Sequence, residues 1–283
     1  MEKPFWISVI KNDYAVPAGF TPLALTEELF SFISSTDPEL RDSIGLEVFY
    51  NWLERGLYRP EDLRGFIPRL LANLQEGLGE KEGDLVFQRA FSSLWLALIL
   101  QHDNQKPDLS GEELVAILEA LRAYFAAEQD YRGFERGKGF AHSMAHAADL
   151  FAALATSPRL GESEHLQILE AIAAKLKAIP DWVFIYGEES RLAAAALQIF
   201  ARGTLRLEQI KTWLDSLSAD WHNSWWDEGR ALAFFNGRNF VRVLHYRLLA
   251  REDVAERETI LKMLRETLDQ VNPIVMPELD PGA

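Results

Sequence analysis

Apolar residues recur at helical spacing along almost the whole chain, and the alternation that marks β-strands is scarce. The first helical stretches span Thr21–Ser35, Asp37–Gly56 and Arg59–Gly79. Thr21 and Asp37 are suited to cap helices because each is followed by a proline, and Gly56 provides a stop signal. Pro68 lies inside the third stretch and should begin a new turn or kink the helix.

The remainder of the chain continues the same pattern. Helical periodicity predicts further helices over Gly83–Gln101, Ser110–Asp130, Gly139–Ala155, Ser163–Ala178, Glu188–Ala201, Leu207–Leu217, Asn236–Ala250 and Asp253–Val271. Only the run WVFIY, Trp182–Tyr186, is strand-like, and five apolar residues do not decide between helix and strand. Short turns rich in Gly, Pro, Asp and Ser join these segments.

Short turns between helices of this length favour stacked helix pairs. We therefore predict an all-α protein, an α-α superhelix of antiparallel helix pairs of the HEAT or armadillo kind. It should form a single domain over residues 1–283, with an extended, proline-containing tail from about residue 272. A closed α/α toroid is the alternative arrangement of many antiparallel helix pairs.

Composition narrows the classes of function. The chain of 283 residues has a net charge of −14 and no cysteine, which excludes disulfides, thiolate metal sites and cysteine nucleophiles. The acidity argues against binding to nucleic acid. The amino terminus lacks the pattern of a signal peptide, and the longest apolar run, Leu94–Leu100, is far shorter than the ~18 residues of a membrane span. We expect a cytoplasmic, bacterial protein that does not enter a membrane.

The stretch EQDYRGFERGKGFAHSMAHAADL, Glu128–Leu150, differs from the rest of this acidic chain. Within the predicted helix Gly139–Ala155, an apolar stripe should face the core; it consists of Phe140, Met144, Ala147, Phe151 and Leu154. On the opposite side, His142, His146 and Asp149 share a face with small alanines. Small residues around a polar triplet indicate close approach by a ligand or by another helix.

These polar residues allow several kinds of site. His142 and His146, at i and i+4, could bind one divalent metal such as zinc, manganese or iron, with a further ligand from elsewhere. In an enzyme, His146 oriented by Asp149 would be the general base. The other interpretation is a buried polar cluster whose imidazoles bond to a neighbouring helix. Whether the protein is an enzyme stays open.

A set of cations lies directly before this helix. The segment RGFERGKG places Arg132 and Lys138 among glycines near a helix amino terminus, an arrangement that suits a phosphate or a carboxylate. Alternatively, nearby carboxylates neutralise these cations locally; those carboxylates are Glu128, Asp130 and Glu135.

Three other segments carry candidate chemistry. Glu188 and Glu189 begin a predicted helix, where carboxylates are favourable in any case, and Arg191 follows them. A basic row on another helix face could line a groove; it consists of Arg238, Arg242 and His245. A cluster of tryptophans beside carboxylates would suit a sugar-cleaving toroid or simply fill space between helices; it consists of Trp221, Trp225, Trp226, Asp227 and Glu228.

The motifs DYRGFERGKGFAHSMAHAADL, FIYGEESRLA and NFVRVLHYRL together resemble an uncharacterised bacterial family, domain of unknown function 2785. The family pattern has a tryptophan at the position of Phe140 and a glycine at that of Ala147, and both departures are mild. The resemblance implies a helical fold and no reaction. It also implies one constellation, formed by Arg132, Gly133, Lys138, His142, His146, Asp149, Glu189 and Arg191.

The function predicted from the sequence is binding of a small anionic ligand, with or without a divalent metal. The pocket would be lined by His142, His146 and Asp149. The ligand contacts would come from Arg132, Lys138, Glu188, Glu189, Arg191, Arg242 and His245. One alternative is a non-catalytic scaffold for a protein partner, which a His142 face closed against a neighbouring helix would favour. A second is a glycosidase-like toroid that uses Asp227 or Glu228.

Overall fold

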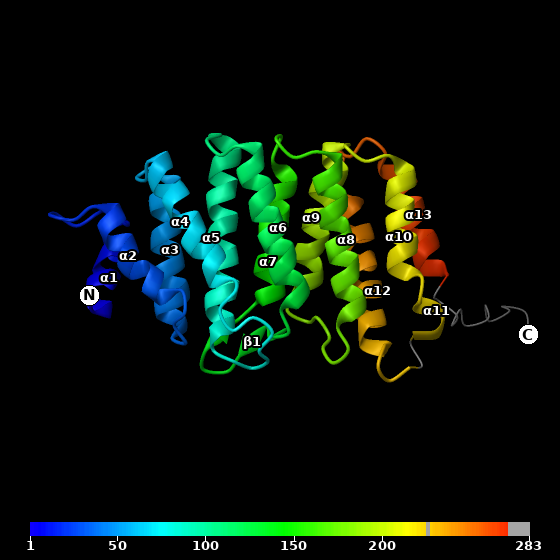
Figure 1. The fold of residues 1–283 in the computed structure, drawn as a ribbon, viewed down its shortest axis with the longest axis horizontal. Helices are drawn as coiled ribbons and strands as arrows, with labels where there is room; N and C mark the ends of the chain where they lie inside the picture. The colour runs from blue at the N-terminus through cyan, green and yellow to red at the C-terminus, as the bar shows by residue number, and fades with distance from the viewer. Residues whose placement is uncertain (225–226, 271–283) are drawn as a thin grey trace, which may run out of the picture.

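The computed structural model describes residues 1–224 and 227–270, and its helices stand side by side in one long row (Figure 1). The helices in the first half are α1 (Lys3–Lys11), α2 (Pro22–Phe32), the π-helix η1 (Glu39–Leu46), α3 (Glu47–Glu54), α4 (Pro60–Asn73), α5 (Leu85–Gln105) and α6 (Gly111–Ala127). Those in the second half are α7 (Ser143–Thr156), α8 (Glu162–Ala178), α9 (Glu188–Arg202), α10 (Leu207–Ser218), α11 (Trp221–Ser224), α12 (Ala231–Leu248) and α13 (Arg257–Asp269).

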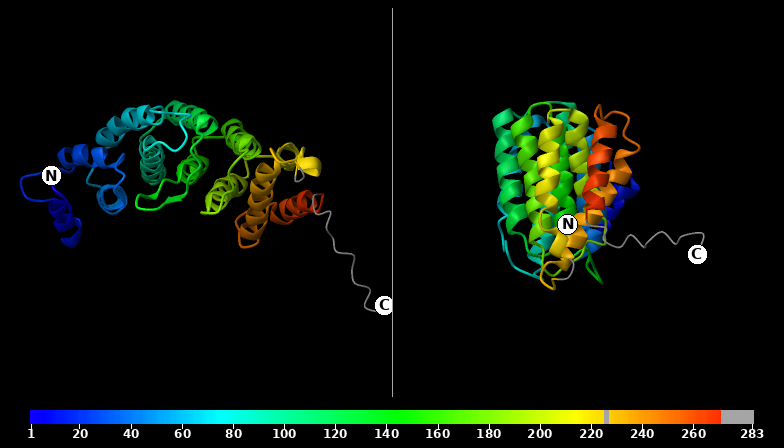
Figure 2. Two further views of the ribbon diagram at one scale, coloured as in Figure 1. Left: turned by 90° about the horizontal axis from the view of Figure 1, so that it is seen from below. Right: turned by 90° about the vertical axis from the view of Figure 1, so that its right-hand side faces the viewer.

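The helices form an open arch with an inner and an outer layer. Seen from below in Figure 2, α5, α7, α9 and α12 follow one another on the concave side, and α6, α8 and α10 form the convex side. The helices α1 and α13 lie at opposite ends of the row (Figure 1). The predicted all-α superhelix is therefore confirmed, and the alternative of a closed α/α toroid is wrong.

A continuous apolar core runs between the layers, from Trp6 near the amino terminus to Leu264 in α13. Phe49 stacks on Trp95 with ring centroids 4.0 Å apart, which joins α3 to α5. Helices α7 and α9 are rich in fully buried alanines, so neighbouring inner helices can approach closely. The single-domain assignment stays a prediction, and the tail predicted from about residue 272 lies outside the described residues.

Several predicted helix ends are confirmed by their local chemistry. The Oγ1 atom of Thr21 accepts a hydrogen bond from the backbone N–H of Ala24 at 3.2 Å, with Pro22 at the first position of α2. Helix α3 ends at Glu54, and Gly56 follows in the left-handed region with φ of 64°. Pro68 lies within α4, which continues on both sides of it.

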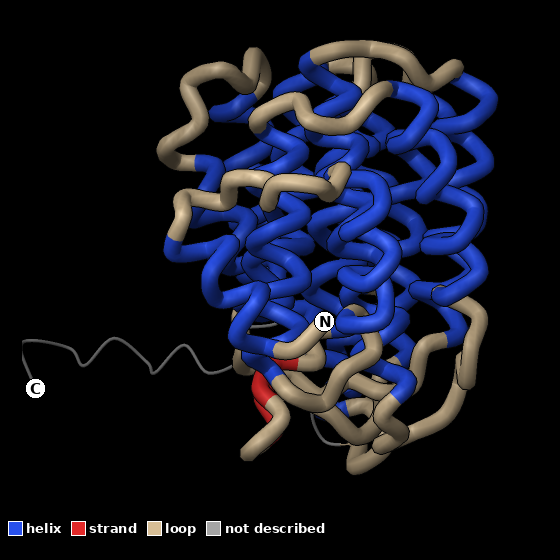
Figure 3. The backbone as a smooth tube through the Cα atoms, turned by 90° about the vertical axis from the view of Figure 1, so that its left-hand side faces the viewer, coloured by secondary structure: helices blue, strands red, loops and turns tan. Residues whose placement is uncertain are grey.

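The helix predicted to begin at Gly139 instead begins at Ser143, and this changes the interpretation of the residues before it. Strands β1 (Phe134–Glu135) and β2 (Gly139–Phe140) form an antiparallel hairpin among the loops at one edge of the arch, where Figure 3 shows the strands. Gly139 has φ of 78°, which no helix allows. The core position predicted for Phe140 is wrong, since it lies in β2 and is 41% exposed. Trp182–Tyr186 form neither helix nor strand.

An ion pair buried inside the arch holds the end of α6. The Arg89 guanidinium on α5 donates to both carboxylate oxygens of Glu128, at 2.6 and 3.0 Å, and both side chains are at most 1% exposed. One of these oxygens also accepts from the backbone N–H groups of Gln129 and Asp130. The Nζ atom of Lys175 on α8 donates to the carbonyl oxygen of Glu128 at 2.6 Å, and burial lowers the pKa of Lys175 to about 8.

Removal of the Glu128 carboxylate should destabilise the fold strongly. We expect Glu128→Ala to lower the free energy of unfolding by about 3–5 kcal/mol, because the Arg89 charge would stay buried without a partner. Urea unfolding followed by circular dichroism measures this change. Asp215→Ala is the matched control, since the exposed Lys211–Asp215 pair should contribute less than about 1 kcal/mol. Similar losses in the two variants would contradict this account of the Arg89–Glu128 pair.

Candidate functional site

The loop between α6 and α7 is held by its own charged residues. The Arg132 guanidinium donates to the Asp130 carboxylate, with its closest contact at 2.6 Å, and to the carbonyl oxygen of Gly83 at 2.8 Å. It also forms an ion pair with Glu135. Asp130 and Glu135 therefore neutralise the charge of Arg132, as the alternative interpretation of these cations predicted.

Lys138 is neutralised in a similar way. Its Nζ atom lies 2.7 Å from the Asp84 carboxylate and 3.1 Å from that of Glu135. Asp84 directly precedes α5, so this contact crosses between elements that are distant in the sequence. Glu128, which we predicted to neutralise these cations, pairs with Arg89 instead. An anion at Arg132 or Lys138 would have to displace these carboxylates.

The two histidines lie together and are enclosed. His142 has a left-handed backbone with φ of 56° at the start of α7, and its ring stacks on that of Phe140 at 4.2 Å. The Nδ1 atom of His146 is 3.3 Å from the carbonyl oxygen of Ala90 on α5, and its ring meets the edge of Phe91. The side chains are 7% and 4% exposed, and their ring centroids are 5.6 Å apart. His146 therefore packs against α5, and the Phe140 ring covers His142.

Burial keeps both imidazoles neutral. It lowers the pKa of His142 to about 4, and the positive charge of Arg191 adds to this effect. Burial also lowers the pKa of His146 far below its ordinary value, helped by the charge of Arg191. A neutral imidazole has one nitrogen free to accept a hydrogen bond.

The acidic candidates lie close to these histidines. Asp149 on α7 forms an ion pair with Arg191 on α9, so the contact that the structure gives this carboxylate is to Arg191 and not to His146. Burial raises the pKa of Asp149, and Arg191 opposes that rise. Glu188 is 1% exposed, and its Oε2 atom accepts from the backbone N–H of Tyr186 at 2.8 Å.

Three polar atoms in this region are buried and have no hydrogen-bond partner among the described residues. We call them the rim acceptors, and they are His142 Nε2, Glu188 Oε1 and Glu189 Oε2. Burial of an unpaired polar atom costs free energy unless a water or a ligand satisfies it. The rim acceptors therefore mark a place where a bound group would be stabilised.

Exposed apolar side chains lie beside the rim acceptors. We call them the rim cluster, and they are Phe134 (50% exposed), Phe140 (41%), Ile185 (68%) and Tyr186 (38%). The Phe140 ring lies 5.1 Å from that of Phe134 and 6.3 Å from that of Tyr186. Sequence reasoning missed the rim cluster, because the two-residue strands on either side of the Gly-Lys-Gly turn are too short to show alternation.

A second exposed surface runs along α12. Its residues are spaced at helical intervals and form the α12 stripe, which consists of Phe235, Asn239, Arg242, Tyr246 and Leu249. Arg238 lies beside the stripe, and both burial and the charge of Arg242 lower its pKa. Within residues 1–224 and 227–270, neither Arg238 nor Arg242 forms an ion pair. His245 is half-buried on α12, and burial together with the charge of Arg265 on α13 lowers its pKa.

The predicted site residues therefore do not form one site. The structure gathers a group at the starts of α7 and α9, formed by His142, His146, Asp149, Glu188, Glu189 and Arg191. Arg132 and Lys138 hold the hairpin, and Arg242 lies on α12.

The tryptophan cluster predicted for a toroid is only partly described. Trp221 is 3% exposed and packs closely on Gly237 and on the edge of Phe234. Trp225 and Trp226 lie outside the described residues. Asp227 forms an ion pair with Arg230. A buried Trp221 offers no platform for a sugar.

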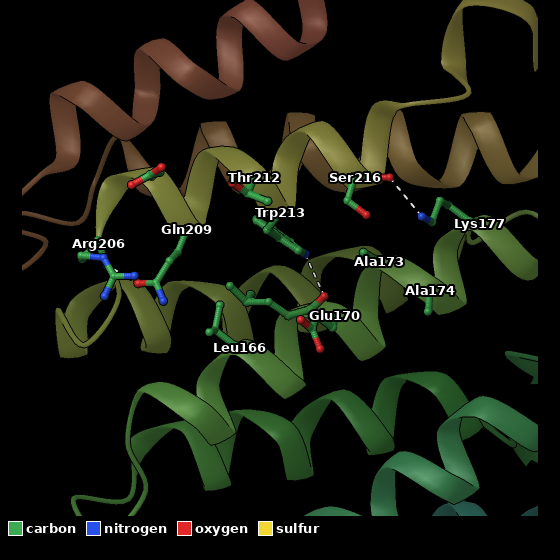
Figure 4. A pocket seen from close by; sticks show the side chains of 12 residues that line it. Leu166, Glu170, Ala173, Ala174, Lys177, Arg206, Gln209, Thr212, Trp213 and Ser216 are labelled. Carbon is green, nitrogen blue, oxygen red and sulfur yellow. Dashed lines mark hydrogen bonds between the residues drawn. The ribbon is translucent and has the colours of Figure 1, made fainter.

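A groove of about 570 Å³ lies between α8 and α10 on the convex side (Figure 4). Inside it, Trp213 Nε1 donates to the carbonyl oxygen of Leu169 at 2.8 Å, and Lys177 Nζ donates to that of Ser216 at 3.0 Å. Both bonds tie α8 to α10, so the polar groups drawn there serve helix packing.

The described residues contain neither a cluster of metal ligands nor a helix that could span a membrane. Within that part of the chain, no group of three or more His, Cys, Asp or Glu side chains is placed to hold a metal ion. In the same residues, no helix combines the length and the apolar character needed to cross a membrane.

A family model described as "protein of unknown function (DUF2785)" matches residues 74–246, and the chain belongs to this family. The resemblance predicted from the sequence motifs is thus confirmed. The match spans the inner helices α5, α7 and α9, the hairpin, and α12 almost to its end. None of the curated proteins and none of the solved structures compared with the chain matches it.

The buried imidazoles predict a loss of stability in acid. In the unfolded chain His142 takes up a proton near its ordinary pKa of 6.5, whereas in the folded protein it does so only near pH 4. Between these values the unfolded state binds more protons, so the free energy of unfolding should fall as the pH drops. For His142 the loss amounts to about 3 kcal/mol.

Urea unfolding between pH 7 and pH 4 measures this loss. Asp149 and Glu188 have raised pKa values and contribute with the opposite sign, so the wild type must be compared with His142→Gln, which keeps both carboxylates. The difference between the two curves should shrink as the pH falls. A constant difference over this range would show that His142 is not buried in neutral form.

Proposed function

We propose that this member of the DUF2785 family is a non-catalytic scaffold that holds an acidic segment of a protein partner on the concave side of its arch. The observation that carries the proposal is the pair Arg238 and Arg242, which have no ion-pair partner among the described residues of a chain with net charge −14. Arg238 and Arg242 lie one turn apart on α12, so two positive charges stand side by side in a chain in which acids outnumber bases by 43 to 29.

The position of the pair supports this use. Helix α12 belongs to the inner row and packs against α8, α9 and α13, which leaves the α12 stripe uncovered. Stacked helical repeats form extended concave surfaces, and proteins of this architecture use such surfaces for binding. A partner segment would therefore meet the stripe along its length.

The charges favour an acidic occupant. Burial and the neighbouring charge of Arg242 both act against the positive charge of Arg238, as the lowered pKa shows. A carboxylate placed between the two guanidinium groups would relieve their repulsion and accept paired hydrogen bonds. Because the rest of the surface is acidic, it would repel an acidic segment and so favour binding at the α12 stripe.

The stripe also offers apolar anchors. Tyr246 is 75% exposed and Leu249 is 52% exposed, and Phe235 lies at the other end of the stripe. Aromatic residues and arginines dominate the energetics of protein interfaces. Anchors on both sides of the arginines suit an extended or helical peptide better than a small ion.

The geometry supports the scaffold more than the pocket predicted from the sequence. The Phe140 ring stacks on His142, His146 packs against Phe91 and Ala90 of α5, and the predicted ligand contacts Arg132 and Lys138 are paired with carboxylates. A small anion would have to displace carboxylates from Arg132 and Lys138 to bind there. Binding of a divalent metal such as zinc, manganese or iron at His142 and His146 stays a prediction.

An acidic peptide of about ten residues, rich in glutamate and with a central leucine, is the probe for this proposal. We expect fluorescence anisotropy to show saturable binding that weakens with added salt. The double variant Arg238→Ser/Arg242→Ser should reduce the affinity at least roughly tenfold, because each charge-assisted pair contributes about 1.5–3 kcal/mol.

Arg202→Ser is the matched control, since Arg202 is exposed at the end of α9 and lies off the stripe. It should bind the probe as the wild type does. Equal binding by the double variant, or equal binding of a glutamine version of the peptide, would refute the assignment of the α12 stripe.

A further inference from the structure

The rim acceptors and the rim cluster are connected through a short series of contacts. Phe140 covers the His142 ring, and Tyr186 lies edge-on to Phe140. The backbone N–H of Tyr186 then bonds to Glu188, which begins α9. The loop before α9 and the hairpin before α7 therefore meet, with aromatic rings outside and unpaired acceptors behind them.

The hairpin holds Tyr186 in place. A Cβ atom at Gly133 would lie 1.9 Å from the Tyr186 ring, so only glycine allows the ring to pack on the hairpin backbone. The position of Tyr186 is therefore built into the fold. Its ring is still 38% exposed and can contact a ligand.

Among the residues that carry the rim acceptors, only Glu188 and Glu189 bear a charge, and that charge is negative. Arg191 and Asp149 neutralise each other, and His142 is neutral, which leaves the carboxylates of Glu188 and Glu189. The rim acceptors can all accept hydrogen bonds, since one nitrogen of a neutral imidazole accepts and carboxylate oxygens only accept. Exposed aromatic faces attract cations.

From this arrangement we infer that the rim cluster and the rim acceptors form a binding site for an organic cation with several N–H donors, a primary ammonium or a guanidinium. The N–H groups would satisfy Glu188 Oε1, Glu189 Oε2 and His142 Nε2, and the rings of Phe140 and Tyr186 would cover the cation. Glu188 is 1% exposed and His142 7% exposed, so these acceptors are otherwise cut off from solvent. The site is independent of the α12 stripe.

Titration of the full chain with simple cations tests the inference. The probes are methylammonium and methylguanidinium, compared with tetramethylammonium, which has the charge but no N–H donor, and with acetate. NMR of labelled protein should show saturable shifts at His142, Phe140 and Tyr186 with at least one of the first two probes. Tetramethylammonium should bind roughly tenfold more weakly or not at all, because it leaves the acceptors unpaired.

Glu188→Gln should weaken binding of the better probe at least roughly tenfold. Glu119→Gln, which removes an exposed carboxylate from α6, is the matched control and should change nothing. If Glu188→Gln is not folded by circular dichroism, Tyr186→Ala removes an exposed ring instead and should weaken binding severalfold. Equal binding of tetramethylammonium, no effect of the variants, or shifts with acetate alone would overturn the inference.

Discussion

The buried pair of Arg89 and Glu128 is the constraint on which this part of the structure depends. Because the pair has no access to solvent, every polar group around it must be matched inside the protein. The backbone after Glu128 turns so that two N–H groups point back at the carboxylate, and this ends α6. Lys175 then satisfies the freed carbonyl of Glu128, so α5, α6 and α8 are fixed relative to one another at a single point.

The hairpin follows the turn after Glu128, and its contacts determine which polar groups of the motif are already paired. Arg41, 1% exposed, donates to the carbonyl oxygens of Lys138 and Phe140, which fastens the hairpin to the first helices. With Arg132 and Lys138 paired to carboxylates, the basic residues of the motif serve to hold a loop. His142 has a left-handed backbone conformation, and the Phe140 ring covers one face of its imidazole. Among the groups that have no partner in the described residues are the rim acceptors and the arginines of α12.

The helices could be predicted from the sequence because their causes are local. Thr21 and Pro22 mark the start of α2. The spacing of apolar residues along each helix shows which of its faces is buried. The hairpin could not be predicted from the sequence, since its strands of two residues are too short to show alternation. The ion-pair partners of Lys138 and Glu128 could not be predicted either. Asp84 lies 54 positions from Lys138, and Arg89 lies 39 positions from Glu128. The open face of α12 depends on how all the preceding helices stack.

Polar and charged groups without partners lower the free energy of unfolding, which is an argument that they serve binding. The chain has 43 acidic and 29 basic residues, so a base often has a carboxylate nearby. Lys211 and Asp215, one turn apart on α10, form such an ion pair. Arg238 and Arg242 instead lie beside each other, while Glu188 and Glu189 keep oxygens without partners. Both arrangements reduce stability, and packing does not require either, because the adjacent core is fully buried. Local conflicts of this kind are expected where a surface is kept for a ligand rather than for the fold.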